Sequence, residues 1–141
     1  MTYEDAITAM YEKSKQNMAK FGKQSFQILI VAMTEELGEL AQAYLQAEFD
    51  GKPKTRIYEE AIDLGALCLQ FDVDSLGILE EVKYGDDQPI SKYPTIELLR
   101  LLSVLASQQY VSNENVGTEL LAEILSTCAI IVETTQTQKE K

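Results

Sequence analysis

The chain has no histidine, and only two of its 141 residues are cysteines. Without histidine, the Glu-x-x-His di-iron site of ferritin-like proteins cannot be built. Cys68 and Cys128 each lie inside an apolar run, which favours two buried free thiols over a disulfide or a metal site. Any metal site in this chain is therefore expected to use carboxylate oxygens.

The sequence also lacks a long apolar run. The stretch 26–33 is interrupted by Gln27 and stops at Thr34, whereas a membrane-spanning helix needs about 18 or more apolar residues. The first ten residues carry acids where a secretion signal would carry bases. We therefore expect a cytoplasmic protein that does not enter a membrane.

Basic side chains are scarce. The chain has twelve lysines and arginines but 23 aspartates and glutamates, which gives a net charge of −11. Such a surface repels a polyphosphate backbone, so no nucleic-acid partner is expected. A small anionic ligand can still bind where a divalent cation bridges it to carboxylates, because the ion inverts the local charge.

Extended runs of alternating polarity are missing as well, and apolar residues recur at helical spacing almost throughout. This pattern predicts a single all-α domain over residues 1–141, a bundle of about five helices with a four-helix core. An acidic hairpin (26–71) supplies two helices of that core. Either a second hairpin (94–135) or another chain would complete it. The expected helices cover 3–20 with Thr2 as N-cap and Met18 on the inner face, 26–49 after the N-cap Ser25, 55–71 with Thr55 as N-cap, a short segment near 76–84, 94–109, and 118–135 before a frayed tail.

Acidic residues occur in two pairs with the same spacing. Glu36 and Glu39 lie three residues apart in "TEELGELAQAYLQ", and Glu60 and Asp63 repeat that spacing in "EEAID" after a gap of 20 residues. Residues three apart share one helix face, and the gap suits a helical hairpin, so four carboxylates can converge. Their mutual repulsion favours a compensating cation, and oxygen ligands favour Mg²⁺ or Mn²⁺ together with phosphate oxygens. The alternative is a solvated acidic surface, although both pairs border apolar stripes.

The stretches "EELGE" and "EAID" resemble the EExxE…ExxD signature of the MazG-like all-α NTP pyrophosphohydrolase superfamily, relatives of the dimeric dUTPases. The other residues of the segment 26–71 also resemble the family's sequences. The resemblance implies Mg²⁺-dependent hydrolysis of a nucleoside triphosphate between its α and β phosphates. It also implies a homo-oligomer, a dimer or a tetramer, of which we favour the dimer. By position it implies Glu36, Glu39, Glu60 and Asp63 as metal ligands. A nearby carboxylate can accept the proton of a metal-bound water, and we expect Glu35 or Glu36 to be that base.

One part of the family pattern is missing. Members commonly carry a basic, Asn-containing segment after the second acidic pair, whereas "FDVDSLGILEEVKYGDD" offers Lys83 as its one cation. Phosphate contacts would then have to come from the chain's scattered cations, namely Lys52, Lys54, Arg56, Lys83, Lys92 or Arg100. Of these we favour Lys54, Arg56 and Lys83. Two other functions stay open: a catalytically degenerate relative that binds nucleotides without hydrolysing them, and a structural helical module.

The second hairpin resembles the acidic one in length and apolar pattern. Aligning "MTEELGELAQAYL" with "PTIELLRLLSVLA" puts Glu97 opposite Glu36 and Arg100 opposite Glu39. If the two hairpins correspond, the second copy lacks most of the acids.

Overall fold

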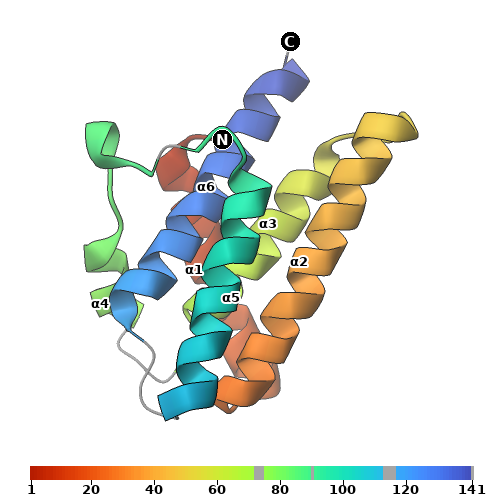
Figure 1. The fold of residues 1–141 in the computed structure, drawn as a ribbon. Coiled ribbons are helices and arrows are strands. Elements are labelled where there is room, and N and C mark those ends of the chain that lie inside the picture. The colour runs from red at the N-terminus through yellow and green to blue at the C-terminus, as the bar shows by residue number, and fades with distance from the viewer. Residues whose placement is uncertain (72–74, 90, 113–116, 141) are drawn as a thin grey trace.

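The computed structural model of the protein describes residues 1–71, 75–89, 91–112 and 117–140. The described residues form six α-helices and one short 3₁₀ helix, with no strand among them (Figure 1). These are α1 (Tyr3–Phe21), α2 (Phe26–Phe49), α3 (Thr55–Cys68), α4 (Ser75–Glu81), η1 (Gly85–Asp87), α5 (Pro94–Ser112) and α6 (Thr118–Glu140). The predicted all-α class is confirmed, and the short segment after α3 adds a sixth helix. In the part of the chain described, no helix is both long and apolar enough to cross a bilayer.

Four of the helices form the core of the bundle. The hairpin of α2 and α3 lies beside the hairpin of α5 and α6 (Figure 1). The most extensive contact joins α3 to α6, and α2 also packs against α5, so the four helices close a ring. Leu40, Leu64, Leu105 and Leu125, one from each helix, are fully buried. The chain's own second hairpin therefore completes the core, while α1 packs against α3 and α6, and α4 against α6.

Helix starts follow the predicted caps at two places. The amide of Asp5 donates to Thr2 Oγ1 at 3.1 Å, and the amide of Thr2 donates to Asp5 Oδ2 at 3.2 Å, which is the reciprocal capping box. The amide of Ile28 donates to Ser25 Oγ at 3.2 Å and satisfies an orphan donor of α2. The short link between these helices begins at Gly22, whose φ of +71° suits glycine at a helix end.

The expected N-cap of α3 is wrong. Lys54 already has helical dihedral angles (φ −76°, ψ −3°), so Thr55 is the first helical residue and no side chain caps this end. The helix also ends earlier than predicted, at Cys68, because Leu69 and Gln70 continue in a tighter turn whose amides bond to the carbonyls three residues back. At the other end of the chain, α6 continues through the expected frayed segment to Glu140.

The inner face of α1 ends on a different residue from the one predicted. Met18 is 36% exposed. The buried stripe runs through Ile7, Met10 and Ser14, and at helical period its next position is Asn17. Asn17 Nδ2 donates to Gln70 Oε1 at 2.8 Å, which ties the last turns of α1 to the end of α3 by a polar contact.

The two cysteines are buried free thiols, as predicted. Burial raises the pKa of each thiol well above its ordinary value. A thiol must lose its proton to act as a nucleophile or metal ligand, so neither cysteine is suited to that chemistry.

α1 approaches α3 closely at Gly65. A Cβ there would clash with Sδ of Met10, which is fully buried. Gly65→Ala is therefore expected to lower the melting temperature, because overpacking costs about 1–3 kcal/mol against about 1 kcal/mol from the better helix propensity of alanine. The matched control is Gly38→Ala, where a Cβ meets nothing within 4 Å. The control should gain about 3 °C by thermal denaturation. An equal gain in Gly65→Ala would contradict the close packing.

Candidate metal centre

Three of the four predicted carboxylates come together across α2 and α3, whereas Glu39 groups with the acids of its own helix. One carboxylate oxygen from each of Glu36, Glu60 and Asp63 lies within 4.8 Å of the other two. A second group consists of Glu35, Glu36 and Glu39, whose carboxylate oxygens also lie within 4.8 Å of one another. Glu36 belongs to both groups, so it links the pair on α2 to the pair on α3.

Acidic groups often gather on protein surfaces without an ion, so burial is the informative property here. Glu36 Oε2 and Glu60 Oε2 are both buried and have no hydrogen-bond partner. The Glu60 side chain as a whole is only 12% exposed. A buried carboxylate oxygen without a donor is costly, because it has lost its hydration and gained nothing in return. The two oxygens therefore require a proton or a cation.

The metal-free site meets this requirement by holding protons. Burial, followed by a proton shared with the Glu60 carboxyl and the charges of Glu39 and Asp63, raises the pKa of Glu36 to about 8. Burial is also the main cause that raises the pKa of Glu60. The pKa of Asp63 is raised by burial, although the nearby Lys13 ammonium opposes the change. A cation would have to displace at least one proton from this cluster near neutral pH.

Two cations lie at the rim of the cluster. Arg56 Nη2 is 3.5 Å from Glu60 Oε1, and Lys13 Nζ is 3.8 Å from Asp63 Oδ1. Both basic side chains are more than 40% exposed, so solvent screens these pairs. Neither one reaches the buried Oε2 atoms. No sequence pattern marks Lys13 as a site residue, because only the docking of α1 against α3 brings it to Asp63.

The predicted phosphate contacts are divided between two sides of the molecule. Arg56 reaches the carboxylates directly, and Lys54 is the residue before α3 begins. Lys83 lies elsewhere: it lines a small cavity of about 140 Å³ beside Glu81 and Glu119, where α4 packs against α6. Figure 1 shows α4 on the opposite side of the bundle from α2.

Two larger clefts adjoin the carboxylates. The α1 cleft, about 510 Å³, is lined by Lys13, Gln16, Asn17, Lys20, Phe21, Gln24, Ala32, Glu36, Asp63, Leu67 and Gln70. The turn cleft, also about 510 Å³, is lined by Ala43, Gln46, Lys52, Pro53, Thr55 and Arg56. The sequence had not singled out the polar residues of α1 as site residues, because their spacing is that of an ordinary solvated helix face.

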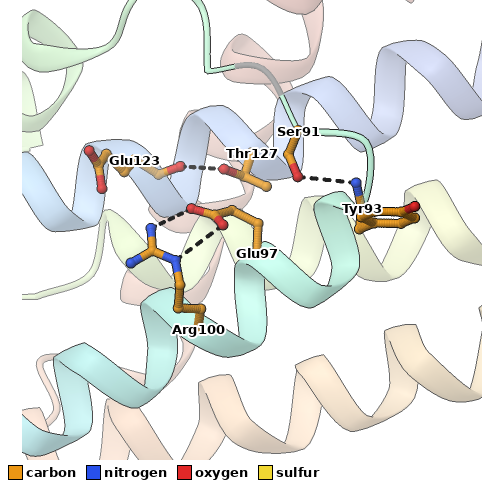
Figure 2. A network of polar contacts seen from close by, with 6 residues as sticks. All are labelled: Ser91, Tyr93, Glu97, Arg100, Glu123 and Thr127. Carbon is orange, nitrogen blue, oxygen red and sulfur yellow. Dashed lines mark hydrogen bonds and ion pairs between the residues drawn. The ribbon is translucent and has the colours of Figure 1, made fainter.

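On the second hairpin, the two positions aligned with Glu36 and Glu39 carry an acid and a base that neutralise each other. Arg100 Nε donates to Glu97 Oε2 at 3.2 Å, and a second guanidinium nitrogen contacts the other carboxylate oxygen (Figure 2). This bond to Arg100 lowers the pKa of Glu97, whereas the pKa of Glu36 is raised. Both possible metal-ligand groups among the described residues lie on the first hairpin. The unneutralised acids are thus a property of α2 and α3 rather than of the bundle.

The surroundings of the carboxylates can bind a cation and a polyanion together. Oxygen ligands, an excess of negative charge and buried unpaired oxygens suit a hard divalent ion. The flanking lysines and arginine suit the phosphates that such an ion would carry. Comparisons of the chain with protein-family models, with curated proteins and with solved structures each found no match.

Proposed function

We propose that this protein is a Mg²⁺-dependent nucleotide pyrophosphohydrolase of the MazG-like type, which converts a nucleoside triphosphate and water into the monophosphate and pyrophosphate. The observation that carries the proposal is the pair of buried, unpartnered oxygens of Glu36 and Glu60 within a cluster of acids. A solvated structural surface would leave its carboxylates hydrated, so this observation disfavours a purely structural module.

The donor set fits a hard divalent ion. Glu36, Glu39, Glu60 and Asp63 offer only oxygen atoms, which Mg²⁺ and Mn²⁺ prefer, and the chain has no histidine to favour softer metals. These four residues would hold the ion. When bound, the ion would neutralise phosphate charge and lower the pKa of a coordinated water.

Side chains of the protein would accept the proton of the attacking water and bind the phosphates. Glu35 is exposed and lies beside Glu36 and Glu39, so its carboxylate is the better placed of the two candidate bases to accept the proton of an attacking water. The water oxygen bonds to the α-phosphorus, the bond from that phosphorus to the bridging oxygen breaks, and pyrophosphate leaves. Arg56 and Lys54 would stabilise the phosphate charge.

Nucleotide binding without turnover is the second candidate function. The observation that favours it is the position of Lys83, since the one cation expected after the second acidic pair lies in a different cavity. A site with fewer phosphate contacts would still bind a metal–nucleotide complex but would stabilise the transition state less.

We further propose that the chain forms a homodimer through α5. Ile96, Leu99 and Tyr110 are 65%, 57% and 92% exposed. Together with the small exposed residue Ala106 they follow heptad spacing, and the polar Ser103 occupies the position between Leu99 and Ala106. This is the spacing of a coiled-coil seam, and an uncovered apolar stripe of that kind suits a second helix.

The proposal is tested by product analysis. The protein is incubated with each common ribo- and deoxyribonucleoside triphosphate in the presence of Mg²⁺, Mn²⁺ or EDTA. We expect equal amounts of monophosphate and pyrophosphate from at least one substrate, with the metals and not with EDTA. Release of diphosphate and inorganic phosphate would contradict the assigned reaction. No turnover, with thermal stabilisation by metal and nucleotide together, would favour the binding protein instead.

A further inference from the structure

The two clefts open at opposite ends of the carboxylate cluster. On α2, residues 32, 36, 39, 43 and 46 follow one helix face. On α3, residues 56, 60, 63 and 67 do the same, and Gln70 lies in the turn that follows the helix. The α1 cleft is lined by the Ala32 and Gln70 ends of these two rows, and the turn cleft by the Gln46 and Arg56 ends. The acids occupy the middle of both rows, so the carboxylates lie between the two clefts.

The α1 cleft has the chemistry of a nucleoside site. Four carboxamide side chains line it, and each can both donate and accept hydrogen bonds, as the edges of nucleobases and the sugar hydroxyls require. The bond between Asn17 and Gln70 fixes two of these amides. Phe21 adds an aromatic ring that is 59% exposed, with Lys20 Nζ 5.1 Å from its centroid. Exposed aromatic rings can stack on nucleobases.

The turn cleft has the chemistry of a phosphate site. Lys52 and Arg56 line it together with the Thr55 hydroxyl, and no carboxylate belongs to its lining. Arg56 Nη1 donates to Gln46 Oε1 at 3.2 Å, a contact that holds the guanidinium at the mouth of the cleft. A planar guanidinium binds two phosphate oxygens at once, and a lysine adds a point charge.

We propose that a nucleoside triphosphate spans the carboxylates with one polarity, its base and sugar in the α1 cleft and its β and γ phosphates at Lys52 and Arg56. The inference rests on the proposed function and adds the direction of the substrate. The α-phosphate then faces the carboxylates, and pyrophosphate departs through the turn cleft. The lining of the α1 cleft balances Lys13 and Lys20 with the carboxylates of Glu36 and Asp63, whereas the turn cleft has two cations and no carboxylate. The reverse polarity would therefore place the terminal phosphates beside two acids and would leave the guanidinium of Arg56 facing an uncharged base.

The test separates the two ends by binding the two products rather than by turnover. Isothermal titration of the full chain with Mg²⁺ measures the affinity for pyrophosphate and for each of AMP, CMP, GMP and UMP. Arg56→Gln is expected to weaken pyrophosphate about tenfold to a hundredfold and to change monophosphate affinity less than about twofold. Gln16→Ala, at an exposed position of the α1 cleft, is expected to weaken the best-bound monophosphate about threefold to tenfold and to leave pyrophosphate unchanged.

Two further variants are needed, one as a control and one as a substitute for Arg56→Gln. Arg100→Gln removes the same charge from the second hairpin and should alter neither affinity, because Arg100 pairs with Glu97 there. Lys52→Gln, at an exposed residue, repeats the test at the turn cleft if Arg56→Gln is unstable. Loss of monophosphate affinity in Arg56→Gln with pyrophosphate affinity intact would overturn the polarity. Failure of the unmodified protein to bind either product with Mg²⁺ would instead overturn the proposed function, and the polarity with it.

Discussion

Asp63→Asn and Glu39→Gln are each expected to lower pyrophosphate release at least about a hundredfold without unfolding the protein. Even residues that only support a metal ligand typically cost 10–100-fold when replaced, so loss of a ligand charge should cost no less. Both changes keep the shape of the side chain. Activity is measured as the initial rate with Mg²⁺, and folding by circular dichroism.

The matched control is Glu97→Gln on the second hairpin. Glu97 corresponds by alignment to an acid of the cluster, but Arg100 neutralises it and no metal-ligand group includes it. Its rate should stay within about twofold of the unmodified protein, the scatter expected of a remote surface change. Retention of most activity in both Asp63→Asn and Glu39→Gln would remove the carboxylate cluster from the mechanism.

The same two variants should not be less stable than the parent protein when metal is absent. Each removes one charge from a site where like charges repel, and the pair between Lys13 and Asp63 is too exposed to offset this gain. Addition of Mn²⁺ should raise the melting temperature of the parent and of Glu97→Gln but not of the two cluster variants. A change that stabilises the metal-free fold while abolishing activity is typical of a functional site.

The second large effect is on the pH dependence of stability. The folded protein keeps a proton on Glu36 up to a pKa of about 8, whereas the unfolded chain releases it near the ordinary value of 4.5. Between these values the folded state binds more protons, so the free energy of unfolding falls as pH rises from about 4.5 to about 8. The raised pKa values of Glu60 and Asp63 act in the same direction.

This dependence should reverse in the presence of a divalent cation. Because the ion competes with protons for the carboxylates, its stabilising effect grows as pH rises. Without metal we expect the melting temperature to fall by about 3 °C, equivalent to about 1 kcal/mol after allowance for solvent screening. Thermal denaturation from pH 5 to pH 8.5, with Mn²⁺ and with EDTA, measures both curves. Glu36→Gln should flatten the EDTA curve, and parallel curves with and without metal would contradict the account.

The sequence predicted those features of the site that depend on spacing within one helix. Glu36 with Glu39, and Glu60 with Asp63, share a face because residues three apart always do in a helix. The hairpin that joins the pairs followed from the length of the link. The caps at Thr2 and Ser25 were likewise local, since each depends on a hydrogen bond to a residue three positions away.

Features that depend on the docking of separate helices could not be predicted. The contact between Lys13 and Asp63 exists because α1 packs against α3, and nothing near Lys13 in the sequence marks it. The contact of Asn17 with Gln70 likewise spans 53 positions. Lys83 shows the converse: it follows the second acidic pair in the sequence, but α4 packs on α6 and carries it away from the carboxylates.

The most direct test of the account is calorimetric titration of the metal-free protein with Mn²⁺ at pH 7 in two buffers of different ionisation enthalpy. The account predicts one cation site per chain or more, release of about one proton on binding, and competition by Mg²⁺. The same titration of Asp63→Asn should show binding at least about tenfold weaker. Absence of Mn²⁺ binding to the unmodified protein, or equal binding to Asp63→Asn, would contradict the assignment of the α2–α3 carboxylates as a metal centre.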